Sequence, residues 1–334
     1  MNTSGKIARV SLLEIRDLSL SFHQQNQVAV DRVSLVIKKG STLGLVGASG
    51  AGKSSIARAI LLLVKTDSGE IFFKGENVYR MNPQELKATR QRIQLVFQDP
   101  SASLSPRRTV EQTLLEPLQH FAIGDASYRY EKIRQTLHTV GMDQSILQRY
   151  PHQFSSGQQQ RIAIARALVT DPDLLIADEA VSSLDVSIQA QILQLTQKLQ
   201  KDLGITFLFI SHDLAVIRQL ADDVAVMYQG QILEQSPADQ FFGGPVHPYS
   251  KSLLSFAQGK IPSNWPADKW YLERTRQSTG NTSTCVFSGF CPDKMPVCER
   301  LEPAMHDIQN KNQDALRPYC VKCHLYDEMK SNEH

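Results

Sequence analysis

The chain has 334 residues, of which 41% are hydrophobic and 21% are charged, a composition typical of a globular protein with one large domain or two. Lys and Arg total 36 against 34 Asp and Glu, and the net charge of +2 gives no support for a nucleic-acid partner. Residues 1–9 are polar with no apolar core behind them, so a signal peptide is not expected. No apolar run approaches the ~18 residues of a membrane span. We therefore expect a cytoplasmic protein that contacts a membrane only through a partner.

Two strands are predicted at the start of the chain. Residues 12–22 and 28–37 are rich in Val, Leu and Ile with polar alternation, and a polar turn at 23–27 joins them. Phe22 ends the first strand, where a flat ring could stack on a nucleotide base. A core phenylalanine is an equally good interpretation from sequence alone.

The strongest motif follows an apolar strand at 41–46 and precedes a helix at 54–63. It matches the phosphate loop G-x-x-x-x-G-K-[ST] at every fixed position: Gly47, Ala48, Ser49, Gly50, Ala51, Gly52, Lys53 and Ser54. Backbone N–H groups of such a loop wrap around phosphate oxygens, and the helix N-terminus favours their charge. Lys53 adds a positive charge for the outer phosphates, the Ser54 hydroxyl can bind Mg²⁺, and Ser55 is grouped with the nucleotide-binding residues. The alternative is a glycine turn that happens to carry a lysine.

Two more strands are predicted at 70–73 and 93–97. The second ends at Gln98, which is well placed to contact Mg²⁺ or an attacking water, although by itself it is weak evidence. The composition then changes, and helix-like segments around 110–120 and 128–140 predict a helical insert over about 99–160.

A second anion site is predicted where this insert ends. A Ser-Ser-Gly loop lies on the N-terminus of a helix at 162–168, where backbone N–H groups attract anions. Its residues are Ser155, Ser156, Gly157 and Gln158. One compact active site does not obviously need two anion sites, and the alternative is an ordinary Ser-capped helix.

Two adjacent carboxylates, Asp178 and Glu179, end a buried strand that begins at 173. The first suits Mg²⁺, held through water or with Ser54 as second ligand, and the second suits polarising a water for attack on a phosphate. An apolar-Asp-Glu sequence is common, but its position after a phosphate loop strengthens the interpretation. A loop ending at Asp185 and a helix at 187–203 follow.

A further buried strand at 205–210 leads to His212. In an open α/β sheet, ligands bind beyond the carboxyl ends of the strands. We therefore expect four side chains at one edge of the sheet: Lys53, Gln98, Asp178 and His212. A lone histidine is more often structural, but this one shares its edge with the nucleotide site.

In this order, the motifs over residues 10–245 resemble the ATP-binding subunit of an ABC transporter. The resemblance implies an α/β P-loop NTPase with an antiparallel β subdomain and a helical insert, using ATP and Mg²⁺. By position, it implies that Phe22 stacks on the base and that Gln98 couples the nucleotide to a membrane subunit. It also implies Asp178 as the magnesium-side carboxylate, Glu179 as the general base and His212 as the switch residue on the γ-phosphate.

The resemblance also implies partners. The signature loop, 154–158, reaches in the family across a dimer to the other subunit's ATP, and Asp185 contacts that subunit. The expected assembly has a second ABC ATPase subunit, two transmembrane permease subunits and an extracytoplasmic substrate-binding protein, with this chain on the cytoplasmic face of the inner membrane.

Two residues depart from the family pattern. Ser156 replaces the first of two signature glycines, and Ala180 stands where proline usually follows the catalytic glutamate. Neither change removes a charge or a phosphate ligand. Ser156 adds a side chain where a backbone approaches phosphate, so we expect a weakened site and a second, different cassette that keeps both glycines.

A small extension is predicted over 246–334. Residues 246–254 resemble the His-Pro-Tyr segment of the oligopeptide, dipeptide and nickel branch of these importers. Residues 258–284 have the composition of a linker, which packing by Trp265 and Trp270 would hold in place.

All five cysteines lie beyond residue 284, and a local cluster in a cytoplasmic chain favours metal over disulfides. The predicted ligands of a [4Fe–4S] cluster are Cys285, Cys291, Cys298 and Cys320. This cysteine pattern resembles that at the C-termini of peptide-importer ATPases. Cys323 is a spare that could replace Cys320. Zn²⁺ and reduced, unligated thiols are the alternatives.

The sequence thus predicts the ATP-hydrolysing subunit of an importer, above all of di- or oligopeptides, with nickel or another small solute as the alternative cargo. A soluble ABC ATPase of translation or DNA repair is a second class. Translation factors of that type carry two cassettes in one chain, and repair ATPases insert a long coiled coil that is not seen before His152. A third hypothesis makes the cysteine region a redox or metal sensor acting on the ATPase.

Overall fold

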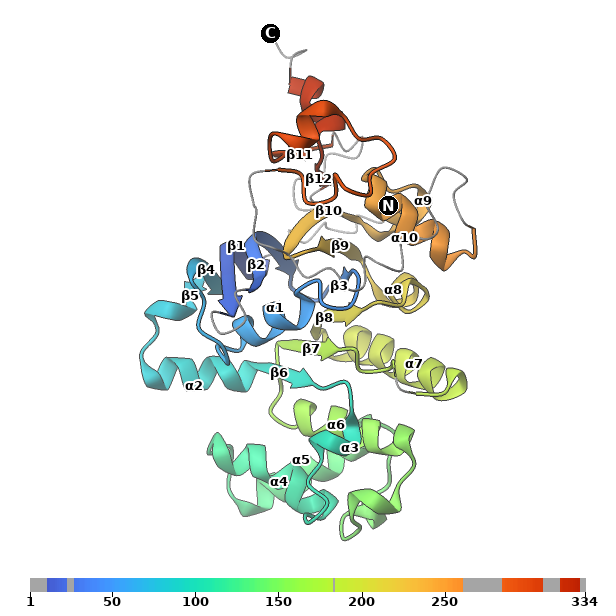
Figure 1. Cartoon of the computed structure of the whole chain (residues 1–334). Helices are drawn as coiled ribbons and strands as arrows, with labels where there is room; N and C mark the ends of the chain where they lie inside the picture. The colour runs from blue at the N-terminus through green and yellow to red at the C-terminus, as the bar shows by residue number, and fades with distance from the viewer. Residues whose placement is uncertain (1–10, 23–26, 183, 261–283, 309–318, 331–334) are drawn as a thin grey trace, which may run out of the picture.

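The computed structural model describes residues 11–22, 27–182, 184–260, 284–308 and 319–330. Their strands form two sheets, which Figure 1 shows between a helical layer at one end of the molecule and the C-terminal extension at the other. This arrangement confirms the α/β class, with an antiparallel subdomain built by the first strands.

The smaller sheet is antiparallel with the order β2-β1-β4-β5. Its strands are β1 (Ser11–Phe22), β2 (Gln27–Lys38), β4 (Ser68–Phe73) and β5 (Glu76–Asn77). Apolar residues of β1 such as Leu13 pair with Ile37 of β2 on one side and Phe73 of β4 on the other. Burial of this apolar set fixes the register, because a slip of one residue would move every side chain to the opposite face.

The larger sheet has the order β11-β12-β10-β9-β3-β8-β7-β6. Its strands are β3 (Thr42–Val46), β6 (Ile93–Val96), β7 (Leu174–Asp178), β8 (Thr206–Ser211), β9 (Asp223–Tyr228), β10 (Gln231–Pro237), β11 (Met305–Asp307) and β12 (Cys320–Lys322). The strands from β9 to β6 are parallel, and β10, β12 and β11 extend the sheet antiparallel. β3, β8 and β9 are buried throughout, as expected for strands covered on both faces.

Helices cover both faces of the larger sheet. The α-helices are α1 (Lys53–Ile60), α2 (Pro83–Arg92), α3 (Pro100–Ser103), α4 (Val110–His120), α5 (Ala126–Thr139), α6 (Ser156–Leu168), α7 (Val186–Leu203), α8 (Leu214–Leu220), α9 (Ala238–Gly243) and α10 (Pro248–Ala257). Short 3₁₀ turns are η2 (Val78–Arg80), η3 (Gln144–Ile146), η4 (Pro151–Gln153), η5 (Pro296–Glu299) and η6 (His324–Lys330). The helix predicted at 110–120 coincides with α4, whereas α1 ends three residues before the predicted end.

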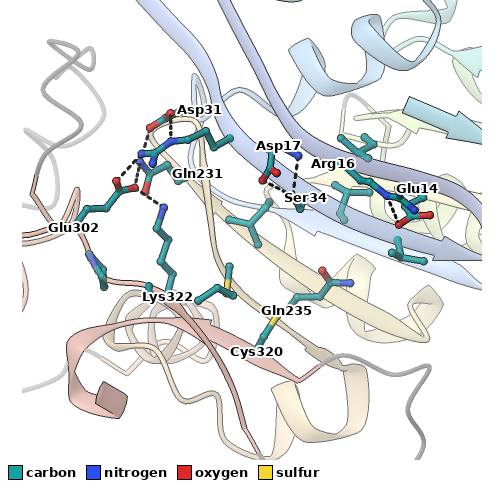
Figure 2. A pocket seen from close by; sticks show the side chains of 18 residues that line it. Glu14, Arg16, Asp17, Asp31, Ser34, Gln231, Gln235, Glu302, Cys320 and Lys322 are labelled. Atoms are coloured by element: carbon teal, nitrogen blue, oxygen red, sulfur yellow. Dashed lines mark hydrogen bonds and ion pairs between the residues drawn. The ribbon is translucent and has the colours of Figure 1, made fainter. Parts of the chain in front are cut away.

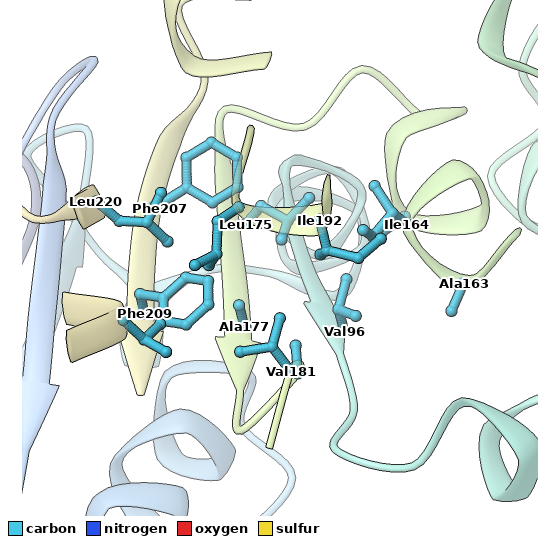
Figure 3. Packing of buried hydrophobic residues seen from close by; sticks show 14 of the residues in the cluster. Val96, Ala163, Ile164, Leu175, Ala177, Val181, Ile192, Phe207, Phe209 and Leu220 are labelled. Atoms are coloured by element: carbon cyan, nitrogen blue, oxygen red, sulfur yellow. The ribbon is translucent and has the colours of Figure 1, made fainter. Parts of the chain in front are cut away.

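The two faces of β8 belong to different hydrophobic cores. Phe207 and Phe209 point toward α6 and α7, where they pack with residues such as Ile164 and Ile192 (Figure 3). Leu208 and Ile210, which alternate with them, belong to the core between the two sheets. The strand is therefore held from both sides, and the residues that follow it have a fixed starting point.

The C-terminal extension continues the larger sheet. β12 pairs with β10, and β11 pairs with β12. Most of the predicted linker, including Trp265 and Trp270, lies outside the described residues.

Glu302 links this extension to the first strands. Its carboxylate accepts hydrogen bonds from Arg32 at 2.5 Å, Lys322 at 2.6 Å and Gln231 at 3.1 Å. These residues border a cavity of about 620 Å³ between β1, β2, β10 and the extension (Figure 2). Burial alone would raise the pKa of Glu302, but the hydrogen bonds from Lys322 and Arg32 outweigh it and hold that pKa below its ordinary value.

Glu302→Gln tests this link. Because the pKa of Glu302 is lower in the folded state, its ionised carboxylate stabilises the fold at pH values above the ordinary pKa of glutamate. This stabilisation is lost as the pH falls through the lowered, folded-state pKa. At pH 7 we expect the free energy of unfolding in urea to fall by roughly 1.5–3 kcal/mol, the scale of a hydrogen bond to a charged group. The difference from the parent should shrink below about pH 4. Glu76→Gln, which neutralises an exposed carboxylate on β5, is the control, and equal effects of the two changes would contradict the assignment.

Candidate nucleotide site

The phosphate loop is wedged between two strands. A Cβ on Gly47 would lie 2.1 Å from the backbone O of Met227 in β9, and a Cβ on Gly52 would lie 2.1 Å from the backbone O of Ala29 in β2. Both contacts are with backbone atoms that cannot move aside, so only glycine fits. The two glycines let the loop lie close against both sheets.

Lys53 lies inside this loop. Its Nζ donates hydrogen bonds of 2.8 Å to the carbonyl oxygens of Gly47 and Ala48, and the residue is only 4% exposed. Burial lowers the pKa of the ammonium group, an effect opposed by the charges of Glu179 and Asp178. An ammonium has three N–H donors, so one remains for a phosphate oxygen.

Ser54 and Asp178 meet at the ends of α1 and β7. The Ser54 hydroxyl donates to Asp178 Oδ1 over 3.1 Å. Burial raises the pKa of Asp178, while the hydrogen bond from Ser54 lowers it. A hydroxyl beside a carboxylate is the hard-oxygen donor set that Mg²⁺ prefers next to phosphates. These two residues therefore fit a magnesium ion.

Glu179 and His212 also meet at this edge. Glu179 Oε1 lies 3.2 Å from His212 Nδ1. The Glu179 backbone has a positive φ of 49°, a conformation that costs a non-glycine residue of order 1–3 kcal/mol and that concentrates at functional sites. Its N–H donates to the Ile210 carbonyl at 3.0 Å. Through this hydrogen bond β8 holds the strained turn that aims the carboxylate toward His212.

Gln98 joins the site through Ser182, a residue that the sequence analysis did not single out. Gln98 Nε2 lies 3.5 Å from Ser182 Oγ, and that hydroxyl donates to the Glu179 carbonyl over 2.9 Å. In the sequence, the only indication of this role is that Ser182 lies in the loop between Glu179 and Asp185.

The remaining predicted nucleotide contacts lie elsewhere in the chain. Ser155 caps α6, because its hydroxyl accepts from the Gln158 N–H and the Gln158 side chain accepts from the Ser155 N–H. Asp185 is exposed before α7 and makes no side-chain cap in that helix. Phe22, at the end of β1, packs against the core between the sheets. No described hydrogen bond connects these four residues to Lys53.

The two signature positions have different surroundings. A Cβ on Gly157 would lie 2.5 Å from Cγ2 of Ile188 in α7, so glycine is needed for α6 and α7 to approach. Ser156 is exposed. Its side chain therefore causes no crowding within the chain.

Four of the five cysteines lie together. Burial raises the pKa of the Cys291 thiol, and the nearby thiols of Cys323 and Cys285 raise it further, while those of Cys285 and Cys298 act in the same way on the pKa of Cys323. Cys320, which was predicted as the fourth ligand, lines the cavity of Figure 2 beside Gln235. The structure thus groups Cys323 with the first three cysteines, because Cys320 lies on the other side of β12.

Backbone N–H groups surround these thiols. Backbone N–H groups two residues further along lower the pKa of three thiols: that of Phe287 acts on Cys285, that of Asp293 on Cys291 and that of Leu325 on Cys323. Burial raises the pKa of Cys291 to about 12 and that of Cys323 to about 11. Among the described residues, no three His, Cys, Asp or Glu side chains converge closely enough to hold a single metal ion.

Within the described residues, no helix is both long and apolar enough to cross a membrane.

Comparison with known proteins gives consistent results. Residues 30–182 match the family model described as ABC transporter. The oligopeptide transport ATP-binding protein AppF of Bacillus subtilis is 40% identical over 328 residues, which cover 95% of this chain and 98% of that protein. A putative peptide import ATP-binding protein of Brucella abortus is 41% identical over 304 residues, covering 89% and 95%.

Solved structures agree with the fold. CbiO1 of Clostridium perfringens, part of the ABC transporter complex CbiONQ, superposes with a TM-score of 0.63 at 26% identity, covering 70% of this chain and 91% of that one. A dimeric ATP-binding cassette bound to ADP and Pi superposes with a TM-score of 0.60 at 27% identity, covering 68% and 98%.

The different surroundings of Ser156 and Gly157 can be tested by their stabilities. Gly157→Ala should lower the free energy of unfolding by about 1–3 kcal/mol, because the new methyl group forces α6 away from α7. Ser156→Gly, its matched control, should change it by much less, since Ser156 is exposed. Equal losses in urea denaturation would mean that the contact with Ile188 does not constrain the helix pair.

Proposed function

Because the chain belongs to the family of ABC transporter ATP-binding subunits, we propose that it hydrolyses ATP to drive the import of di- and oligopeptides. The names of the relatives that match nearly the whole chain support this cargo. Nickel or another small solute is the second candidate, because the His-Pro-Tyr segment is shared with that branch. The observation that carries the proposal is the pair of contacts at one sheet edge, Ser54 with Asp178 and Glu179 with His212.

The phosphate loop would bind the ATP phosphates. The third N–H of Lys53 is available for a phosphate oxygen, and backbone N–H groups at the start of α1 supply further donors. Ser54, Asp178 and Gln98 would hold Mg²⁺, which supplies positive charge that offsets the charge developing on the phosphates.

Glu179 would orient the attacking water and accept its proton. Its strained backbone and the hydrogen bond with His212 hold the carboxylate in one direction before the water arrives. His212 is half exposed, with a relative side-chain accessibility of 52%, so its ring can also reach a γ-phosphate oxygen. Preorganised groups of this kind lower the barrier because they need no rearrangement during the reaction.

A second cassette would complete each site. Ser155, Ser156, Gly157 and Gln158 stand at the capped start of α6, whose backbone N–H groups would bind the partner's ATP. Asp185 and the neighbouring Val186, 85% exposed, would contact that partner. We expect a different chain there, whose signature keeps both glycines.

The other partners follow from the proposed transport. Two permease subunits would carry the pathway through the membrane, with this chain on the cytoplasmic face of the inner membrane and Gln98 beside the permease contact. An extracytoplasmic binding protein would deliver the peptide.

The cysteine group would hold a [4Fe–4S] cluster through Cys285, Cys291, Cys298 and Cys323. Two observations support a fit. The four thiols lie together, and backbone N–H groups bond to the sulfurs of three of them, which stabilises thiolates. Positive charge from iron would offset the burial that otherwise keeps the thiols protonated. Zn²⁺ is the alternative metal for the same thiols.

Glu179→Gln tests the assignment of the base. The assembled importer carrying this variant should bind ATP but hydrolyse it roughly 10²–10⁴ times more slowly, because one well-placed base contributes about that factor. Hydrolysis at the parent rate would rule out this role. Lys53→Ala is the contrasting variant, and there we expect weaker ATP binding itself.

The cysteine assignment can be tested with two matched variants. Anaerobically purified parent protein should absorb near 400 nm and contain about four irons and four sulfides, as a [4Fe–4S] cluster requires. Cys323→Ser should lose most of the iron, whereas Cys320→Ser should keep it. A colourless protein holding one zinc would favour the alternative metal, and a protein free of metal would contradict both.

A further inference from the structure

The phosphate loop is contacted by a tyrosine that lies 201 residues further along the chain. The N–H of Ala48 donates a hydrogen bond of 3.2 Å to the hydroxyl of Tyr249, in the first turn of α10. Tyr249 is completely buried. The Ala48 N–H is partly buried, and a donor left without a partner there would be costly, so this hydroxyl satisfies it.

This contact acts on Lys53. Tyr249 holds the N–H of Ala48, while the Nζ of Lys53 donates to the carbonyl oxygens of Gly47 and Ala48. The same short stretch of backbone is therefore held by both side chains. The direction of those carbonyls sets the position of the ammonium group. Tyr249 therefore acts on Lys53 through the loop backbone rather than by direct contact.

Tyr249 is itself held firmly by its own segment. The neutral ring of His247, whose pKa burial lowers to about 3, caps α10 by accepting the Tyr249 N–H at Nδ1 over 3.0 Å. The buried Glu234 carboxylate of β10 accepts from the N–H groups of Val246 and His247 at 3.0 and 2.9 Å. The start of the helix cannot shift without breaking these hydrogen bonds.

The Tyr249 ring is packed from two sides. Its centroid lies 4.7 Å from that of Tyr228 in β9 and 5.4 Å from that of Phe287 in the C-terminal extension. Phe287 is fully buried, and its N–H bonds to the Cys285 sulfur. Tilted aromatic contacts of this kind stabilise the packing beyond the burial of surface area alone. The ring thus lies between the nucleotide loop and the cysteine group.

We propose that Tyr249 is a positioning residue of the nucleotide site, which sets the phosphate loop and Lys53 for ATP and makes that site depend on the C-terminal extension. The inference rests on the proposed ATP binding at Lys53. It assigns to the His-Pro-Tyr segment a role within the ATPase itself.

Tyr249→Phe in the full-length chain tests this proposal. The substitution keeps the ring and removes the hydroxyl. We expect the dissociation constant for Mg·ATP, measured by calorimetry, to rise roughly 2–10-fold, the scale of one lost hydrogen bond. The thermal midpoint without nucleotide should stay within a few degrees of the parent. A purely structural role would lower the midpoint and leave the affinity of the folded protein unchanged.

A further variant controls the experiment. Tyr79→Phe, in η2 of the antiparallel subdomain, removes a hydroxyl that forms a hydrogen bond of 2.9 Å with Thr66, and it should leave the ATP affinity unchanged.

The outcomes separate this inference from the proposed function. A parent protein that does not bind Mg·ATP would overturn the ATPase. A parent that binds Mg·ATP while Tyr249→Phe binds equally well would overturn the positioning role alone.

Discussion

The nucleotide site depends on four neighbouring parallel strands, β3, β8, β7 and β6, whose carboxyl ends lie in register. In the register of the sheet, Val46 pairs with Ser211, Asp178 with Ile210 and Val96 with Ala177. The residues that follow these strands therefore emerge at one edge, where charged and polar side chains meet. Cores on both faces of the sheet hold the strands in this register, so the chemistry is positioned by apolar packing some distance away.

The C-terminal extension is built onto this arrangement. It continues the larger sheet through β12, pairs Glu302 with Arg32, and packs Phe287 against Tyr249. The first two contacts reach β10 and β2, and the third reaches Tyr249 of α10, which in turn bonds to the phosphate loop. The cysteine group is therefore connected to the nucleotide site through Phe287 and Tyr249.

Much of the fold could be predicted from local patterns, and the rest depended on long-range contacts. The helix at 110–120 was visible in its periodicity, whereas α2 was missed although Asn82 and Glu85 form a capping box around its start. Spacing alone favoured Cys320 as a ligand and left Cys323 as the spare. Which side of a short strand each sulfur faces is decided by the pairing of β12 with β10, which leaves no mark on the spacing.

The most direct measurement is an experimental structure of the chain with Mg·ATP bound. The account predicts the triphosphate in the phosphate loop, Mg²⁺ between Ser54 and Asp178, and the γ-phosphate beside Glu179 and His212. Nucleotide bound anywhere else, for example in the cavity beside Glu302, would contradict the assignment of the site.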